Sequence, residues 1–251
     1  MTPRRHVIVN ADDFGQSPGI NHGVIQAHEK GIVTSASLMV RWPPADQAAA
    51  YARDHPTLSL GLHVDLSEWA YRDGAWVPLY QVVPTEDAGA VHDEVSRQLA
   101  EFRRLTGMDP THIDSHQHVH RDEPTRSVLL DLARRMDIPL RHCSPDVNYC
   151  GEFYGQTAEG APLSGRVTTD ALIRILAALP AGVTELGCHP GFGEDLDTMY
   201  LNEREPEVQV LCDPRVQTAL ADLGIELCSF RRLGADRMVS PVSSAHMPAH
   251  P

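Results

Sequence analysis

The chain has 251 residues, of which 42% are hydrophobic and 22% are charged, and its formal net charge is −13. This is the composition of a globular protein with one large domain or two small ones, and the negative charge argues against nucleic acid as a partner. No apolar run is long enough to insert into a membrane or to act as a signal peptide, and five cysteines without a C-x-x-C pair predict reduced thiols in a cytoplasmic protein.

Short apolar runs alternate with helical patterns along most of the chain. In chain order, the predicted strands are residues 6–10, 35–40, 58–66, 111–116, 138–143, 182–189 and 225–230. The predicted helices lie between them at residues 17–31, 45–55, 91–105, 125–136, 168–179 and 214–223. Residues 67–90 and 144–166 are predicted to be loops. Strands that alternate with helices indicate parallel βαβ units.

Seven such units with no break in composition predict a single α/β domain over residues 1–235, folded as a closed or nearly closed (β/α) barrel. A doubly wound open sheet is the alternative. The first strand–helix loop, ADDFGQSPG, is not G-x-G-x-x-G, which argues against a dinucleotide site. Residues 236–251 have no apolar periodicity and are predicted to be a disordered tail.

Acidic and histidine side chains stand where four of the predicted strands end. They are Asp12 and Asp13, His63 and Asp65, Asp114 and His116, and His189. Because the C-terminal ends of parallel strands converge on one face of a barrel, we expect these residues to form one site.

The types of these residues predict a metal-assisted reaction. Asp12 and Asp13 are adjacent and point in different directions, so one could hold a metal while the other accepts a proton; the alternative is an acid pair favoured by a helix dipole. A single histidine at a strand end is more often structural. Asp13 and His116 stand at equivalent strand ends, however, and this favours His63 as a metal ligand. His189, in GCHPG, is either a turn histidine or a general acid poised near neutral pH.

The stretch HIDSHQHVH, residues 112–120, has a histidine or an aspartate at every second position. Alternate residues of a strand lie about 6.5–7 Å apart on one face, so a pair can reach one metal but all five cannot. His116, at the strand end, is the best ligand candidate, and Asp114 is placed to accept a ring N–H from a ligand histidine. His118 is the second choice as a ligand. His112 is expected to be packed below the site, and His120 to be solvated or at the rim of a cleft.

The motifs VNADDFG, GIVTSASLM, GLHVDL, THIDSHQHVH and CHPG, in this order, resemble the YdjC-like carbohydrate deacetylases, which include chitooligosaccharide and hopanoid-associated sugar deacetylases. The resemblance covers roughly residues 6–232. It implies a distorted (β/α) barrel related to polysaccharide deacetylases, a divalent metal, and hydrolysis of the N-acetyl group of an amino sugar. By matching motifs, it implies Asp13, His63 and His116 as metal ligands, Asp12 as the base and His189 as the acid. The loops 67–90 and 144–166 have no clear template.

One aspartate and two histidines would leave coordination positions open, as a catalytic metal requires. Nitrogen ligands suit Zn²⁺, Co²⁺ or Ni²⁺, whereas Mg²⁺ prefers oxygen. Because the ion also depends on which metals are available, we expect either Mg²⁺ or Zn²⁺, with Co²⁺ or Ni²⁺ also compatible. The expected substrate is an N-acetylated amino sugar or a short oligosaccharide, and a homodimer is compatible with the sequence. The alternatives are a phosphoesterase, another amidohydrolase, or a sugar-binding protein without activity.

Aromatic residues of the two long loops are expected to face the substrate. Trp69, Tyr71 and Trp76 lie in the first loop, and Phe153 and Tyr154 in the second. Their rings could stack on sugar rings.

Overall fold

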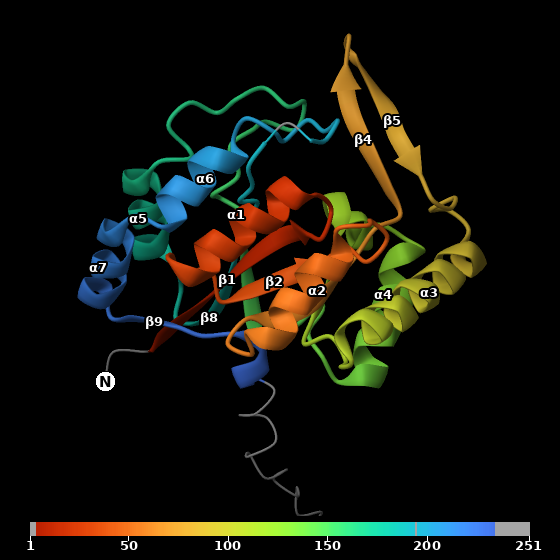
Figure 1. Ribbon diagram of the computed structural model, residues 1–251, viewed down its shortest axis with the longest axis horizontal. Helices are drawn as coiled ribbons and strands as arrows, with labels where there is room; N and C mark the ends of the chain where they lie inside the picture. The colour runs from red at the N-terminus through yellow and green to blue at the C-terminus, as the bar shows by residue number, and fades with distance from the viewer. Residues whose placement is uncertain (1–3, 194, 234–251) are drawn as a thin grey trace, which may run out of the picture.

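The fold is seen in a computed structural model (Figure 1), which describes residues 4–193 and 195–233. The tail predicted at 236–251 lies outside the described residues. Seven strands form one parallel sheet in the order β6-β3-β2-β1-β8-β7, and β9 also pairs with β1. They are β1 (Arg5–Phe14), β2 (Ser35–Leu38), β3 (Ser59–Val64), β6 (Ile113–Ser115), β7 (Val147–Cys150), β8 (Gly182–Cys188) and β9 (Ile225–Leu227).

This order is that of a barrel that does not fully close. Starting from β1, the neighbours on one side are β2, β3 and β6, and on the other side β8 and β7. Among the described residues, the edge strands β6 and β7 do not pair with each other; Leu140 bridges to Ile113 in the space between them. The predicted distorted barrel of about seven parallel strands is therefore confirmed, in the form of a half-barrel.

Helices surround the sheet (Figure 1). They are α1 (Pro18–Glu29), α2 (Ala45–Asp54), α3 (Ala88–Thr106), α4 (Thr125–Met136), α5 (Thr169–Ala178), α6 (Arg204–Leu211) and α7 (Pro214–Leu223). Side-chain caps begin several of them: Ser17 accepts a hydrogen bond from the backbone N–H of Ile20, and Asp87 caps α3 in the same way. No described helix is long and apolar enough to cross a membrane.

Strand β1 is the centre of the core. Val7, Val9 and Ala11 are completely buried between the neighbouring strands and the helices. Each fully buried valine contributes about 1.5–3 kcal/mol relative to an exposed one, which holds the strand firmly in place. Because β1 continues to Phe14, its C-terminal end carries two carboxylates, Asp12 and Asp13, into the interior.

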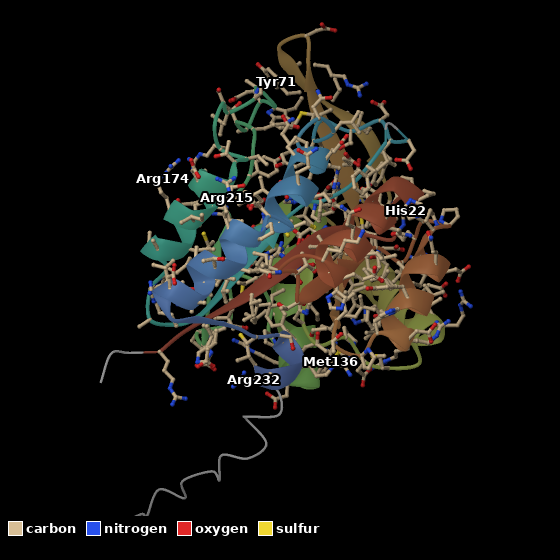
Figure 2. All side chains as sticks on the ribbon, turned by 60° about the vertical axis from the view of Figure 1, so that its left-hand side comes forward. His22, Tyr71, Met136, Arg174, Arg215 and Arg232 are labelled. Atoms are coloured by element: carbon tan, nitrogen blue, oxygen red, sulfur yellow. The ribbon has the colours of Figure 1, made fainter. Side chains whose placement is uncertain are left out.

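The predicted loop 67–90 contains a β-hairpin that was not expected from the sequence. Strands β4 (Ser67–Arg72) and β5 (Ala75–Gln81) pair antiparallel and project from the body of the protein (Figures 1 and 2). Asp73 and Gly74 form the turn, both with positive φ, as a two-residue hairpin turn requires. Asp-Gly between two aromatic runs was therefore a usable signal for this hairpin.

The strand predicted at 138–143 is wrong. Only Leu140 makes a β-bridge, because a turn follows at once: the backbone N–H groups of Cys143 and Ser144 both bond to the Leu140 carbonyl. The sheet continues instead with β7, inside the segment predicted to be the loop 144–166. A second difference is α6, which lies in the segment predicted to be a loop after the sixth strand.

Candidate active site

The end of β1 turns Asp12 and Asp13 toward different partners. The pairing of β1 with β2 is irregular between Ala11 and Phe14, and Asp13 has a φ of 64°. Both aspartates are 2% exposed. Asp12 faces a buried arginine and Asp13 faces two histidines, so the adjacent acids occupy distinct environments, as the sequence predicted.

Asp13 meets His63 from the end of β3 and His116 from the residue after β6. Asp13 Oδ1 lies 3.3 Å from His63 Nε2 and 3.0 Å from His116 Nδ1. All three side chains are almost completely buried, and one ligand atom of each lies within 4.8 Å of the others. The structure thus brings together the three residues that the resemblance implied as metal ligands.

The chemistry of this group fits a divalent cation. The buried Nε2 atom of His63, which faces Asp13, has no hydrogen-bond partner among the described residues. A buried polar atom without a partner is unfavourable, and a cation in this group would satisfy it. Two imidazoles and one carboxylate are also the ligand types of catalytic zinc sites.

Charges around the three residues also favour a cation. Burial opposes protonation of His63, but the Asp114 carboxylate outweighs it and raises the pKa of His63 to about 9. Burial also opposes protonation of His116, but the carboxylate of Asp13 outweighs this effect and raises the pKa of His116 well above its ordinary value. Both imidazoles therefore sit in a negative potential. Protons compete with a metal for them, and metal affinity should weaken as the pH falls.

Asp114 orients one of these histidines. Its Oδ1 atom lies 2.7 Å from His63 Nδ1, and its Oδ2 atom accepts a hydrogen bond of 2.6 Å from the Ser37 hydroxyl. The sequence predicted that Asp114 accepts a ring N–H from a ligand histidine, and the nearest candidate along the chain was His116. Asp114 instead supports His63, because the two residues are direct partners in the register of β3 and β6.

Arg141 holds Asp12 from the turn that follows Leu140. Its guanidinium donates to both oxygens of Asp12, at 2.6 and 2.7 Å, and also pairs with Asp114 and Glu185. Burial would raise the pKa of Asp12, but Arg141 outweighs it and lowers the pKa. Asp12 is therefore an ionised, firmly oriented carboxylate at neutral pH. Arg141 was not identified from the sequence; an arginine within the apolar run IPLRHC was the available signal.

His189 follows β8 and lies next to Asp12, with 3.8 Å between His189 Nε2 and Asp12 Oδ2. Its ring packs against Tyr154 and Tyr200, and its backbone N–H donates to the buried carboxylate of Glu207. Burial lowers the pKa of His189 to about 4, so the imidazole is neutral at pH 7.

Two further charged residues reach this site from segments predicted as loops. Arg204, on α6, donates to Asp13 Oδ2 at 2.7 Å. Glu68, on β4, is 3% exposed and places its Oε2 atom 3.4 Å from His116 Nε2. Neither was identified from the sequence, because no local pattern distinguishes them from surface charges.

A cavity of about 550 Å³ opens above these residues. Asp12, Asp13, His63, His116 and His189 all line it. Among the aromatic residues of the two predicted loops, Trp76, Tyr149 and Tyr154 also line it.

The other aromatic residues that were predicted to face the substrate do not line the cavity. Phe153 is completely buried, which rules out stacking on a sugar. Trp69 and Tyr71 are not among the residues that line the cavity; Tyr71, labelled in Figure 2, packs edge-on against Trp76, and Gln117 bonds to both backbone groups of Trp69. Their predicted contact with substrate is therefore not supported by their positions.

The remaining predicted residues also lie away from the Asp13 group. His120 was expected to be solvated or at a rim, but it is completely buried and bonds to Ser115. His118 lines the same cavity as Asp13, but its ring packs against His120, His142 and Tyr149. Asp65 accepts hydrogen bonds from Arg41, Trp42 and Tyr80 and so anchors the hairpin.

His112 is packed below the site, as expected. Its ring stacks on Phe230 with 3.9 Å between centroids, and its Nε2 atom lies 3.2 Å from the Ser37 hydroxyl. Burial lowers the pKa of His112 from 6.5 to about 4. Between these two values the unfolded chain binds a proton that the folded chain does not, so stability is lost as the pH falls through this window.

We therefore expect His112→Gln to reduce the pH dependence of stability. In the wild type, His112 should contribute a loss of about 3 kcal/mol between pH 6.5 and 4. Urea unfolding at several pH values gives the slope of the unfolding free energy against pH. Between pH 6.5 and 4 this slope should be smaller in His112→Gln than in the wild type by about 1.4 kcal/mol per pH unit, which corresponds to the uptake of one proton. His22→Gln, at the exposed His22 of α1 (Figure 2), is the control and should keep the wild-type slope. Equal slopes for His112→Gln and the wild type would contradict a neutral, buried His112.

Comparisons with known proteins agree with the motifs. A family model described as "YdjC-like protein" matches residues 6–222. A carbohydrate deacetylase from Geobacillus stearothermophilus is 33% identical over 248 residues, covering 90% of this chain and 97% of its own length. A chitooligosaccharide deacetylase from Serratia marcescens is also 33% identical, covering 90% of this chain and 98% of its own length.

Solved structures show the same fold. A protein from Enterococcus faecalis V583, described as a candidate cellobiose-phosphate cleavage protein, has a TM-score of 0.73 and 26% identity, covering 92% of this chain and 99% of its own. A family 4 acetyl xylan esterase from Clostridium thermocellum has a TM-score of 0.53 and 14% identity, covering 94% of this chain and 93% of its own.

Proposed function

The chain belongs to the YdjC-like family, and from this premise we propose that it is a metal-dependent carbohydrate deacetylase. The reaction is hydrolysis of the acetamide of an N-acetylated amino sugar, such as a chitooligosaccharide, to acetate and a free amine. One observation carries the proposal: a firmly oriented carboxylate, Asp12, stands beside the Asp13–His63–His116 group in one cavity. The names of the relatives from Geobacillus and Serratia agree with this reaction.

Asp13, His63 and His116 would hold the divalent ion. When bound, it would polarise the acetamide carbonyl and make a water molecule more acidic. The two nitrogen donors favour Zn²⁺, Co²⁺ or Ni²⁺ over Mg²⁺, which prefers oxygen ligands. Asp114 fixes His63 through its Nδ1 atom and leaves Nε2 directed at Asp13.

Asp12 is placed to accept the proton of the attacking water, because Arg141 orients both of its oxygens. The water oxygen forms the new bond to the carbonyl carbon. His189 is neutral at pH 7 and lies 3.8 Å from Asp12, so it can take this proton and deliver it to the departing nitrogen as the C–N bond breaks. The proton leaves on the amine, and Asp12 and His189 return to their starting states.

The cavity suits a sugar near this group. Trp76 and Tyr154 offer aromatic faces, while Gln117, Gln156 and Thr157 offer polar groups. An aromatic lining with a few polar side chains is typical of small-molecule sites. We propose that a short N-acetylated oligosaccharide enters between the hairpin and the loop that carries Tyr154.

The proposal predicts release of acetate from N,N′-diacetylchitobiose by the purified protein. Chelator treatment should abolish the release, and addition of Zn²⁺, Co²⁺, Ni²⁺ or Mg²⁺ in turn should identify the ion that restores it. His116→Ala should lose activity, and His22→Ala should retain it, because His22 is exposed on α1 and does not line the cavity. Full activity of metal-free protein or of His116→Ala would overturn the mechanism.

The same preparation distinguishes the alternatives. Hydrolysis of phosphate esters without release of acetate would identify a phosphoesterase. Binding of the oligosaccharide in calorimetry, without turnover in the presence of any of the four ions, would identify a sugar-binding protein.

A further inference from the structure

A second group of histidines lies beside the active site. His118 and His120 belong to the 3₁₀ segment His116–Arg121, and His142 belongs to the turn after Leu140. One nitrogen of each ring lies within 4.8 Å of a nitrogen of the other two. Their ring centroids are 5.3, 5.5 and 5.7 Å apart. The three rings thus face a common point from two separate segments of the chain.

Two of these rings carry a free nitrogen. His120 is completely buried; its Nδ1 atom lies 2.7 Å from the Ser115 hydroxyl, and its Nε2 atom has no partner among the described residues. His118 Nε2 lies 3.5 Å from the Tyr149 hydroxyl. The other ring nitrogen, His118 Nδ1, is buried and has no hydrogen-bond partner among the described residues. Metal-binding histidines use one nitrogen for an oxygen partner in this way and the other for the ion.

We propose that His118, His120 and His142 form a second cation site, which binds Zn²⁺ and is separate from the Asp13 group. Three neutral imidazoles without a carboxylate select zinc, nickel or copper and not Mg²⁺. For a tetrahedral zinc ion the ligand nitrogens lie about 3.4 Å apart. The rings must therefore close by a small movement, which His142 allows because it is exposed.

Nearby charges act in both directions on a cation at this point. Arg141 opposes positive charge on all three histidines and Arg121 opposes it on His142, whereas Asp12 favours it on His118 and Asp114 favours it on His120. Arg141 is paired with Asp12, Asp114 and Glu185, which offsets part of its charge. A zinc ion held by the three histidines would join the 3₁₀ segment to the turn after Leu140 and fix His118, which lines the cavity.

Metal counting tests the site without any assay of activity. Untagged protein is freed of metal, equilibrated with a fixed concentration of free Zn²⁺, and its zinc is measured by mass spectrometry. The wild type should bind two ions, His142→Ala one, His116→Ala one, and the double variant none. At higher concentrations of free Zn²⁺, His142→Ala should need at least about tenfold more zinc than the wild type to bind the second ion, because loss of a ligand weakens a metal site at least as much as loss of a group that supports one. Mg²⁺ should not compete for the second ion.

Matched variants show whether the second ion depends on these three histidines. His22→Ala removes an exposed histidine of α1 and should still bind two ions. His118→Asn tests the same site if His142→Ala proves insoluble, and circular dichroism checks that each variant is folded. One ion on the wild type, or two ions on folded His142→Ala or His118→Asn, would overturn the proposal. The proposed deacetylase function depends only on the ion lost in His116→Ala, so the two can fail separately.

Discussion

Replacement of Asp12 by asparagine should reduce kcat for release of acetate by about 10²–10⁴-fold, the range for loss of a general base. Asparagine has the same shape and can still accept from Arg141 with its carbonyl oxygen, but its amide group does not take up a proton. The three residues that would hold the metal are themselves unchanged in this variant. Asp12 bonds to Arg141 and Asn10, but one of its oxygens also lies within 4.8 Å of a His63 nitrogen, so metal content must be measured together with activity.

Kinetics and metal content together test this expectation. kcat and KM should be measured on diacetylchitobiose, with metal determined in the same samples. Asp93→Asn, an exposed aspartate on α3, is the matched control and should behave like the wild type. If Asp12→Asn retains its metal and turns over within tenfold of the wild type, Asp12 is not the base. If it loses its metal, its role is in binding the ion.

Replacement of Arg141 by methionine should lower the free energy of unfolding by about 3–5 kcal/mol, the usual effect of removing one partner from a buried ion pair. Arg141 is completely enclosed and is the shared partner of three carboxylates, on β1, β6 and β8. Methionine fills much of the space but leaves these charges uncompensated. Protein folding and the orientation of Asp12 therefore depend on the same guanidinium.

Urea unfolding at pH 7 measures this loss. Arg103→Met is the control, because Arg103 pairs with Asp109 at the surface of α3, where an ion pair contributes at most about 1 kcal/mol. A loss below about 1 kcal/mol for Arg141→Met would show that the three carboxylates find other compensation, and that folding does not depend on the Arg141 guanidinium.

The fold and most of the catalytic group could be predicted from local patterns. Strands that alternate with helices indicate parallel units, and parallel strands end on one face. Asp12, Asp13, His63, His116 and His189 could therefore be placed together although they span most of the chain. The half-barrel, with Asp13, His63 and His116 in contact, agrees with this prediction.

The stretch HIDSHQHVH shows where local patterns stop being informative. The alternation of a strand holds only as far as Ser115, because Gln117 and His118 have positive φ values of 49° and 55° and turn the chain into a 3₁₀ segment. Counting alternate positions beyond Ser115 therefore misplaced His120, which is buried rather than solvated. It also gave no indication that His118 faces a histidine from another segment.

By itself, the sequence determined the parallel α/β architecture, the family and the residues at the strand ends, because these depend on short-range periodicity and on motifs. Only the tertiary structure decided which charged residues pair with the acids and histidines at the strand ends. Arg141, Arg204 and Glu68 meet Asp12, Asp13 and His116 across 129, 191 and 48 positions of the chain. A buried charge must be paired, and in the curled sheet its partner comes from a distant segment of the chain. The local spacing of residues in the sequence therefore does not predict these pairs.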